Sequence, residues 1–206
     1  IDDLNAIQAD IRSLGFTPEK IYTKTSSGEI VTIKGKKLSV RGSGSDFEVR
    51  NKPIGILFAA LGAPNGDKAK QRYRVPRWIR SAPQYIQREF IAAYFGCELT
   101  TPAVRESSKT NFRTLTFKIA KISSMKNGAK RFIEDISKML RMFNVNIAYI
   151  GEEPGNIRKD GNKTIVLTAN IASNSSIRNL HGKIGYLYAR KKDNLARLAY
   201  QYLVMK

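Results

Sequence analysis

Cysteine is almost absent from this chain of 206 residues, which contains only Cys97. A single cysteine excludes an internal disulfide and a zinc site built from cysteine pairs, and it favours an intracellular, cytoplasmic protein. Long apolar runs are missing too, because the longest, at 54–62 and 90–95, are too short to cross a bilayer. No signal peptide is visible at Ile1.

Acidic residues are scarce as well. The chain has 36 Lys and Arg against 17 Asp and Glu, which gives a net charge of +19. A lysine-rich thermophilic surface normally carries matching glutamate, and membrane binding favours basic residues on one amphipathic helix. Here the basic residues are spread over the whole chain. The imbalance therefore predicts a polyanionic partner, and charge alone leaves both DNA and RNA open.

Periodicity and Gly or Pro boundaries predict an alternation of helices and strands. The expected helices are 2–14, 53–62, 84–98, 129–143, 175–180 and 193–205. The expected strands are 20–24, 29–33, 37–41, 47–50, 112–121, 146–150 and 163–172. A loop rich in Pro and Gly between the halves indicates a linker. We therefore expect one lobe at 1–65, a linker at 66–82 and a second lobe at 83–206.

The two lobes repeat one another weakly. Residues 7–16 form a helix followed by Leu-Gly-Phe, and residues 132–145 form a helix followed by Met-Phe-Asn-Val. In the second copy a helix and strands precede this pair. The repeat therefore predicts that the first lobe lacks a leading helix and strands, which would lie before Ile1.

Residues 88–98 carry the most informative pattern. Ala92, Ala93 and Gly96 place small side chains on one helix face, which lets another helix pack closely. Glu98 lies at the helix C-terminus, where the dipole disfavours a carboxylate, and a divalent cation would compensate it. The spacing alone favours the simpler alternative, a buried core helix with an exposed final Glu.

Four blocks in order resemble a known family. Residues 91–99 resemble a LAGLIDADG motif that ends in Glu, and 66–68 with 75–79 resemble the run that precedes such a motif. Residues 182–188 and 202–206 resemble the end of the same domains. The chain therefore resembles, over nearly its whole length, the LAGLIDADG homing endonucleases of archaeal inteins.

The resemblance implies an α+β fold with two pseudo-symmetric lobes, whose curved antiparallel sheets form a saddle on double-stranded DNA. The protein would be a monomeric, metal-dependent hydrolase that cuts both strands. Glu98 would hold Mg²⁺, and Lys183, Lys68 and Lys70 would be catalytic lysines that stabilise the developing charge.

One departure from the family pattern points to a second function. No second acidic motif is visible, since Asp67 follows Pro64 and Gly66 and cannot end the helix before them. The alternative is a catalytically impaired DNA-binding protein derived from such an enzyme. The nucleophile and the His-Asn ending that self-splicing requires are also missing from the two ends.

The expected DNA contacts lie on strand faces and turns, and most would meet phosphates instead of bases. They are Lys20, Lys24, Lys37, Arg41, Arg50, Arg105, Lys109, Arg113, Lys118, Lys121, Arg158 and Lys163. His181 is expected to be structural and Cys97 to be a small buried residue. The aromatic residues Tyr73, Trp78, Tyr85 and Phe90 are expected to pack in the core instead of stacking on bases.

Overall fold

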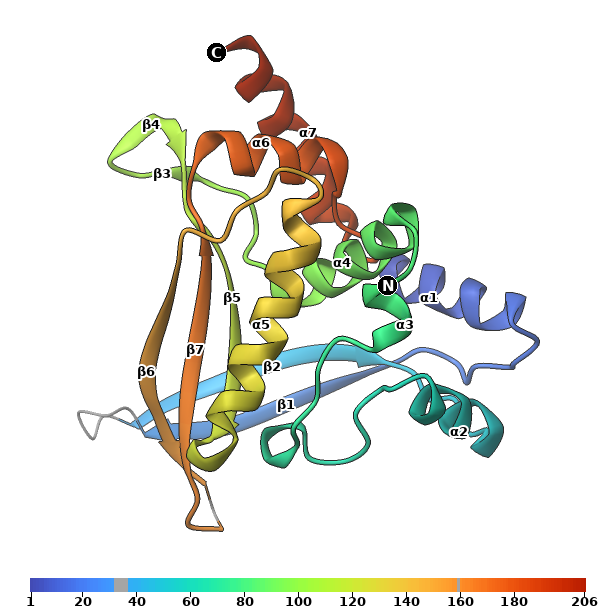
Figure 1. Cartoon of the computed structure of the whole chain (residues 1–206). Coiled ribbons are helices and arrows are strands. Elements are labelled where there is room, and N and C mark those ends of the chain that lie inside the picture. The colour runs from blue at the N-terminus through green and yellow to red at the C-terminus, as the bar shows by residue number, and fades with distance from the viewer. Residues whose placement is uncertain (32–36, 159) are drawn as a thin grey trace. The chain divides into compact units, whose positions relative to one another are not determined.

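The computed structural model describes residues 1–31, 37–158 and 160–206, which divide into two units, Ile1–Leu57 and Phe58–Lys206 (Figure 1). The chain is α+β, whereas the pairing of two lobes into a saddle remains a prediction. None of the described helices is long and apolar enough to cross a membrane.

The first unit consists of helix α1 (Asp2–Ser13) and an antiparallel ribbon of β1 (Tyr22–Val31) and β2 (Lys37–Asp46). The sequence predicted a loop at 42–45, but these residues are paired within β2. Thr23 Oγ1 and Ser45 Oγ lie 2.8 Å apart across the ribbon. Small and hydroxyl side chains on both strands let the ladder continue through a stretch whose composition is typical of a turn.

Helix α2 (Lys52–Ala60) crosses the boundary between the units. Gly62, at a φ of +95°, follows the helix in a backbone conformation that glycine tolerates best. Within the second unit, Trp78 Nε1 donates to the Leu61 carbonyl at 2.8 Å.

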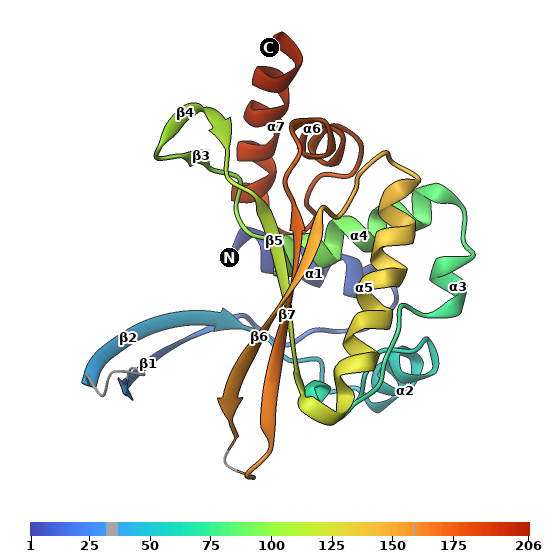
Figure 2. The ribbon, with the colours of Figure 1, turned by 60° about the vertical axis from the view of Figure 1, so that its left-hand side comes forward.

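The second unit is built on a three-stranded antiparallel sheet of order β5 (Leu115–Ile122), β7 (Lys163–Ile171), β6 (Tyr149–Ile157). Helices α4 (Gln84–Glu98) and α5 (Lys126–Arg141) lie on one side of it (Figure 2). The remaining elements are η1 (Lys68–Lys70), α3 (Arg77–Arg80), β3 (Val104–Arg105), β4 (Ser108–Phe112), η2 (Ser123–Met125), α6 (Asn174–Lys183) and α7 (Arg190–Met205).

The core lies between the sheet and these two helices. Alternate residues of β5, among them Phe117, point inward and are buried. The Phe117 ring meets Phe95 and Tyr94 of α4 at centroid distances of 5.6 and 5.8 Å. Burying such a ring fully stabilises the fold by roughly 2–3 kcal/mol. From α5 the apolar stripe that includes Ile133 and Leu140 fills the other part of this layer.

Residues 66–82 belong to the second unit and do not form a separate linker. Val75 and Ile79 are buried in its core. Arg74 donates to both carboxylate oxygens of Asp135 on α5, at 2.9 and 2.5 Å. Pro and Gly shape the path of this segment, but its apolar and paired side chains fix it to the unit.

Gly96 is approached by a loop and not by the second helix that the sequence predicted. A Cβ at this position would lie 1.9 Å from the Leu187 carbonyl oxygen. The Leu187 N–H donates to the Ala92 carbonyl at 3.0 Å, which fixes the α6–α7 connection on α4. The small residues therefore allow a close backbone approach, as expected, but to a different partner.

Candidate nucleic-acid interface

The positive charge is concentrated in the second unit. Residues 58–206 contain 27 Lys and Arg against 10 Asp and Glu, whereas residues 1–57 contain nine against seven. An excess of this size on one unit produces an attractive field for a polyanion over much of its surface. The total charge follows from composition alone, whereas the division into units shows where most of it lies.

The sheet face turned away from α4 and α5 carries one cation of β5, Lys118. Strand alternation places Thr116, Lys118 and Ala120 of β5 there, and the register adds Thr168 of β7 and Gly151 of β6. Lys118 and Ala120 are exposed. The same register places Tyr149 and Glu153 of β6 and Val166 of β7 on this face, so it carries a cation on β5 and a carboxylate on β6.

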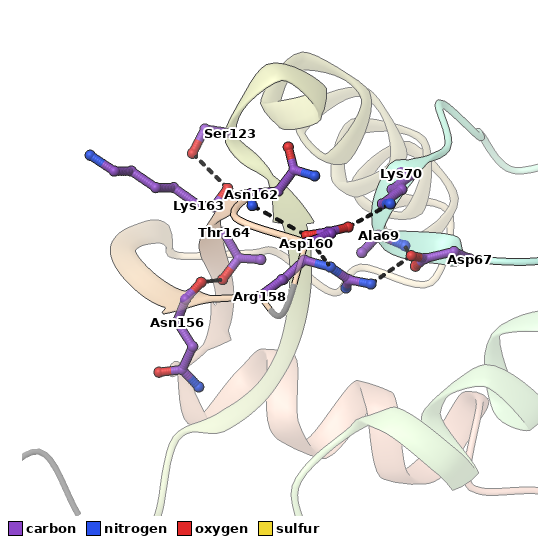
Figure 3. A network of polar contacts seen from close by, with 10 residues as sticks. All are labelled: Asp67, Ala69, Lys70, Ser123, Asn156, Arg158, Asp160, Asn162, Lys163 and Thr164. Carbon is purple, nitrogen blue, oxygen red and sulfur yellow. Dashed lines mark hydrogen bonds and ion pairs between the residues drawn. The ribbon is translucent and has the colours of Figure 1, made fainter.

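The β6–β7 turn is joined to the η1 loop by ion pairs (Figure 3). Arg158 Nη2 lies 2.6 Å from Asp67 Oδ2, and Lys70 Nζ lies 2.5 Å from Asp160 Oδ2. Lys70 and the backbone N–H of Asn162 hold the pKa of Asp160 well below its usual range. The network therefore places cations from two distant segments in one cluster.

Lys121 is not a DNA contact, because its side chain is 1% exposed. Its ammonium donates to the carbonyls of Lys68 and of Gln71, the latter at 2.9 Å, and lies 3.7 Å from the Tyr73 ring centroid. Strand alternation directs it inward with Ile119. Burial lowers its pKa to about 8.

Glu98 and Lys68 line one groove of about 780 Å³, together with Lys118 and several aromatic side chains. Glu98 is exposed at the end of α4. Lys70, expected beside it, is paired with Asp160 instead. Lys183 lies at the C-terminal end of α6 and is not among the residues that line this groove. Of the proposed catalytic residues, the groove brings together only Glu98 and Lys68.

The C-terminus of α4 already has a cation. Lys192 Nζ of α7 donates to the carbonyls of Gly96 and Leu99 at 2.8 and 2.6 Å. An ammonium at a helix C-terminus compensates the dipole, so Glu98 needs no metal ion for that purpose. Within the described residues there is no group of three or more His, Cys, Asp or Glu that could hold a metal. Mg²⁺ at Glu98 thus remains an untested prediction.

The other expected DNA contacts differ in their surroundings. In the first unit, Lys24 lies 3.8 Å from Asp46 and Arg50 lies 3.0 Å from Glu48, while Lys20 and Arg41 are exposed. In the second unit, Arg105 donates to the Phe112 carbonyl, Arg113 pairs with Glu106, and Lys163 is exposed beside the β6–β7 turn. The side chains of Lys37 and Lys109 lie outside those that the structure describes.

Three further expectations have mixed outcomes. His181 is buried, as expected for a structural residue, whereas Cys97 is exposed. Tyr73 and Phe90 pack against the core, but Trp78 and Tyr85 are 49% and 66% exposed. The sequence also gave no signal for the organising roles of Asp135 and Lys192, whose partners are distant along the chain.

Comparisons with known proteins give relatives under three different names. The chain is 47% identical over its whole length to part of the "DNA-directed RNA polymerase subunit Rpo1N" of Methanocaldococcus jannaschii. It is 30% identical to part of the "tRNA-splicing ligase RtcB" of Pyrococcus furiosus and 28% to part of the "Replication factor C small subunit" of M. jannaschii. The chain spans 15%, 20% and 10% of these relatives. No family model and no solved structure matches it.

These relatives overturn the identification drawn from the motif blocks. Their names are those of a polymerase subunit, a ligase and a replication factor, not of homing endonucleases. Membership of the LAGLIDADG family, cleavage of both strands, the intein assignment and the alternative of an impaired descendant are therefore withdrawn. The blocks have a packing role instead, because residues 91–99 and 182–188 meet where Leu187 contacts Ala92 and Gly96.

Proposed function

We propose that this chain is a nucleic-acid-binding module whose second unit contacts the phosphate backbone of duplex DNA. The observation that carries the proposal is the excess of 17 positive charges on residues 58–206. When a lysine or arginine neutralises a phosphate, condensed counterions are released. This release supplies essentially all of the free energy of non-specific binding to DNA. A monomeric state and a cytoplasmic location remain predictions.

The comparisons support a module with a function of its own. One segment of the same length matches proteins whose names refer to DNA-directed RNA synthesis, to tRNA splicing and to replication. The three names refer to three different activities that share no reaction. This supports a function for the shared segment that is separate from each of those activities. All three names refer to nucleic-acid processes, which agrees with a nucleic-acid partner.

The β6–β7 hairpin is the element we assign to the groove of the duplex. Its strands have nine residues each, which makes it about 30 Å long. Because β7 also pairs with β5 from Thr164 to Ile171, only the turn end of the hairpin is narrow enough for the major groove, which is about 12 Å wide. Lys163 and Arg158 lie at the turn, and Lys118 lies on the adjoining sheet face. We expect Lys163 and Lys118 to meet phosphates directly, whereas Arg158 is paired with Asp67.

Fluorescence anisotropy with a duplex of about 30 base pairs tests the proposal. Contact with about four phosphates predicts that affinity falls roughly a hundredfold between about 50 and 200 mM salt. Replacing Lys118 and Lys163 by Ala removes two contacts, so the salt slope should decrease by about two. The matched control replaces Lys130 and Lys138, exposed on α5 on the other side of the sheet, and should leave the slope nearly unchanged.

Two outcomes would contradict the proposal. The first is an affinity that does not change with salt, which would exclude phosphate contacts as the source of binding. The second is a larger loss of affinity in the α5 control than in the Lys118 and Lys163 variant, which would place the contacts on the other side of the sheet. Competition with a structured RNA of equal length separates duplex DNA from RNA, and stronger binding of the RNA would replace DNA as the partner.

A further inference from the structure

Lys121 connects the sheet to the segment 67–71, here called the basic loop. Its buried ammonium donates to two backbone carbonyls of this loop, those of Lys68 and Gln71. The Tyr73 ring, 3.7 Å away, supplies a third favourable contact for the cation. An ammonium has three donors, and two of them are used on the basic loop, whose bonded residues lie 53 and 50 residues away along the chain.

The same loop directs its own cations outward. Lys68 lines the groove and is exposed, while Lys70 reaches Asp160 at the β6–β7 turn. Asp67 begins the η1 turn by accepting from the Ala69 N–H at 3.0 Å and also pairs with Arg158. The outer contacts of the loop are exposed ion pairs, which are weak. The contact with Lys121 is the one that is shielded from water.

We propose that Lys121 is a positioning residue, which holds the basic loop in the conformation in which Lys68 and Lys70 meet nucleic acid. The proposal rests on the proposed function. A loop that is already ordered loses less conformational entropy when it binds than one that must be ordered by the partner. Lys121 itself touches no partner, because it is buried.

The protonation of Lys121 gives this role a distinctive pH dependence. Burial lowers its pKa to about 8, while Asp67 opposes and Lys68 adds to the shift. The titratable groups near the Lys121 ammonium are Asp67, Lys68 and Tyr73. The residue opposite Lys121 on β7 is Ile165, which is apolar. A neutral amine still has two N–H donors for the two carbonyls, and the ordered loop, in which burial lowers this pKa, binds the proton less tightly than an opened loop would. The basic loop should therefore be held more firmly as the pH rises through about 8.

Hydrogen exchange of the amides of residues 69–71 tests the positioning role without any ligand. Lys121→Met keeps the length of the side chain and removes its donors, and we expect exchange at these amides to become at least roughly tenfold faster. Lys118→Met, on the same strand but exposed, is the control and should leave exchange unchanged. Equal protection of these amides in Lys121→Met and the unsubstituted chain would overturn the inference, whether or not the chain binds DNA.

DNA affinity provides the second arm. Lys121→Met should raise Kd roughly tenfold, and its effect should not add to that of Lys68→Ala with Lys70→Ala, because both act through one loop. The effect of Lys118→Met on Kd should add to that of the Lys68→Ala and Lys70→Ala double variant. The affinity of the unsubstituted chain should rise relative to that of Lys121→Met between about pH 7 and 9. Additive effects or parallel pH profiles would overturn the inference, whereas absence of DNA binding by the unsubstituted chain would overturn the proposed function.

Discussion

His181 makes the stability of this protein depend on pH between about 5 and 7, a range in which histidine is the only side chain with an unperturbed pKa. It is the only histidine, it is 7% exposed on α6, and neither ring nitrogen has a hydrogen-bond partner among the described residues. The Tyr186 ring lies 5.9 Å away. Burial lowers the pKa of His181 from 6.5 to about 4, and Asp193 opposes this only in part. The folded state therefore favours the neutral ring.

The sign of the effect follows from the two protonation equilibria. Above pH 6.5 the ring is neutral in both states, so its contribution to stability is fully present. As the pH falls, the unfolded chain takes up the proton first, and stability is lost until the folded state also protonates near pH 4. The full loss is about 3 kcal/mol, of which about 2 kcal/mol falls between pH 7 and 5.

Urea unfolding at several pH values measures this loss. The unsubstituted chain should lose about 2 kcal/mol more than His181→Phe between pH 7 and 5, because Phe keeps a planar ring and cannot bind a proton. The carboxylates away from His181 are the same in both proteins, so their contribution cancels in the comparison. Parallel stability curves, or a His181 proton resonance that titrates near pH 6.5, would refute the reasoning.

Two further predictions concern the contacts that fix α4 and the segment 66–82. Gly96→Ala should destabilise the second unit by about 2 kcal/mol in urea unfolding, because its Cβ would meet the Leu187 carbonyl oxygen. Gly55→Ala, in a helix with nothing near its Cβ, should instead be neutral or stabilising by up to about 1 kcal/mol, and equal effects would contradict the packing argument. Asp135→Ala should lower the free energy of unfolding by about 2 kcal/mol. The loss is smaller than for a fully buried pair, because Arg74 is 42% exposed and can be hydrated. A loss below about 0.5 kcal/mol would show that the pair does not stabilise this segment.

Much of the secondary structure could be predicted because its signals are local. Pro83 and the apolar spacing after it placed α4 within a residue of its observed start, and the apolar stripe from Phe132 to Leu140 located α5. The ribbon β1–β2 was predicted less well. Its Gly and Ser residues at 42–45 are typical of turns, and only the cross-strand partners, such as Ser45 opposite Thr23, show that they are paired.

The candidate interface could be predicted only in part. The sequence identified Lys118, Arg158 and Lys163 as basic residues on strands or turns, and the structure places Lys118 and Lys163 at the surface and Arg158 in an ion pair. It could not separate Lys118 from Lys121 reliably, because the direction of a strand residue depends on which face the helices cover. The short motif blocks also favoured a family that the named relatives do not support.

The sequence by itself determined the charge of the chain and located the helices α4 and α5. These depend on composition and on spacings of a few residues. The tertiary structure decided which cations are available and which are used internally. Lys121 reaches Gln71 from 50 residues away, and Lys192 reaches Gly96 from 96 residues away. Such contacts leave no local signal in the sequence, because each depends on folding that brings distant segments together.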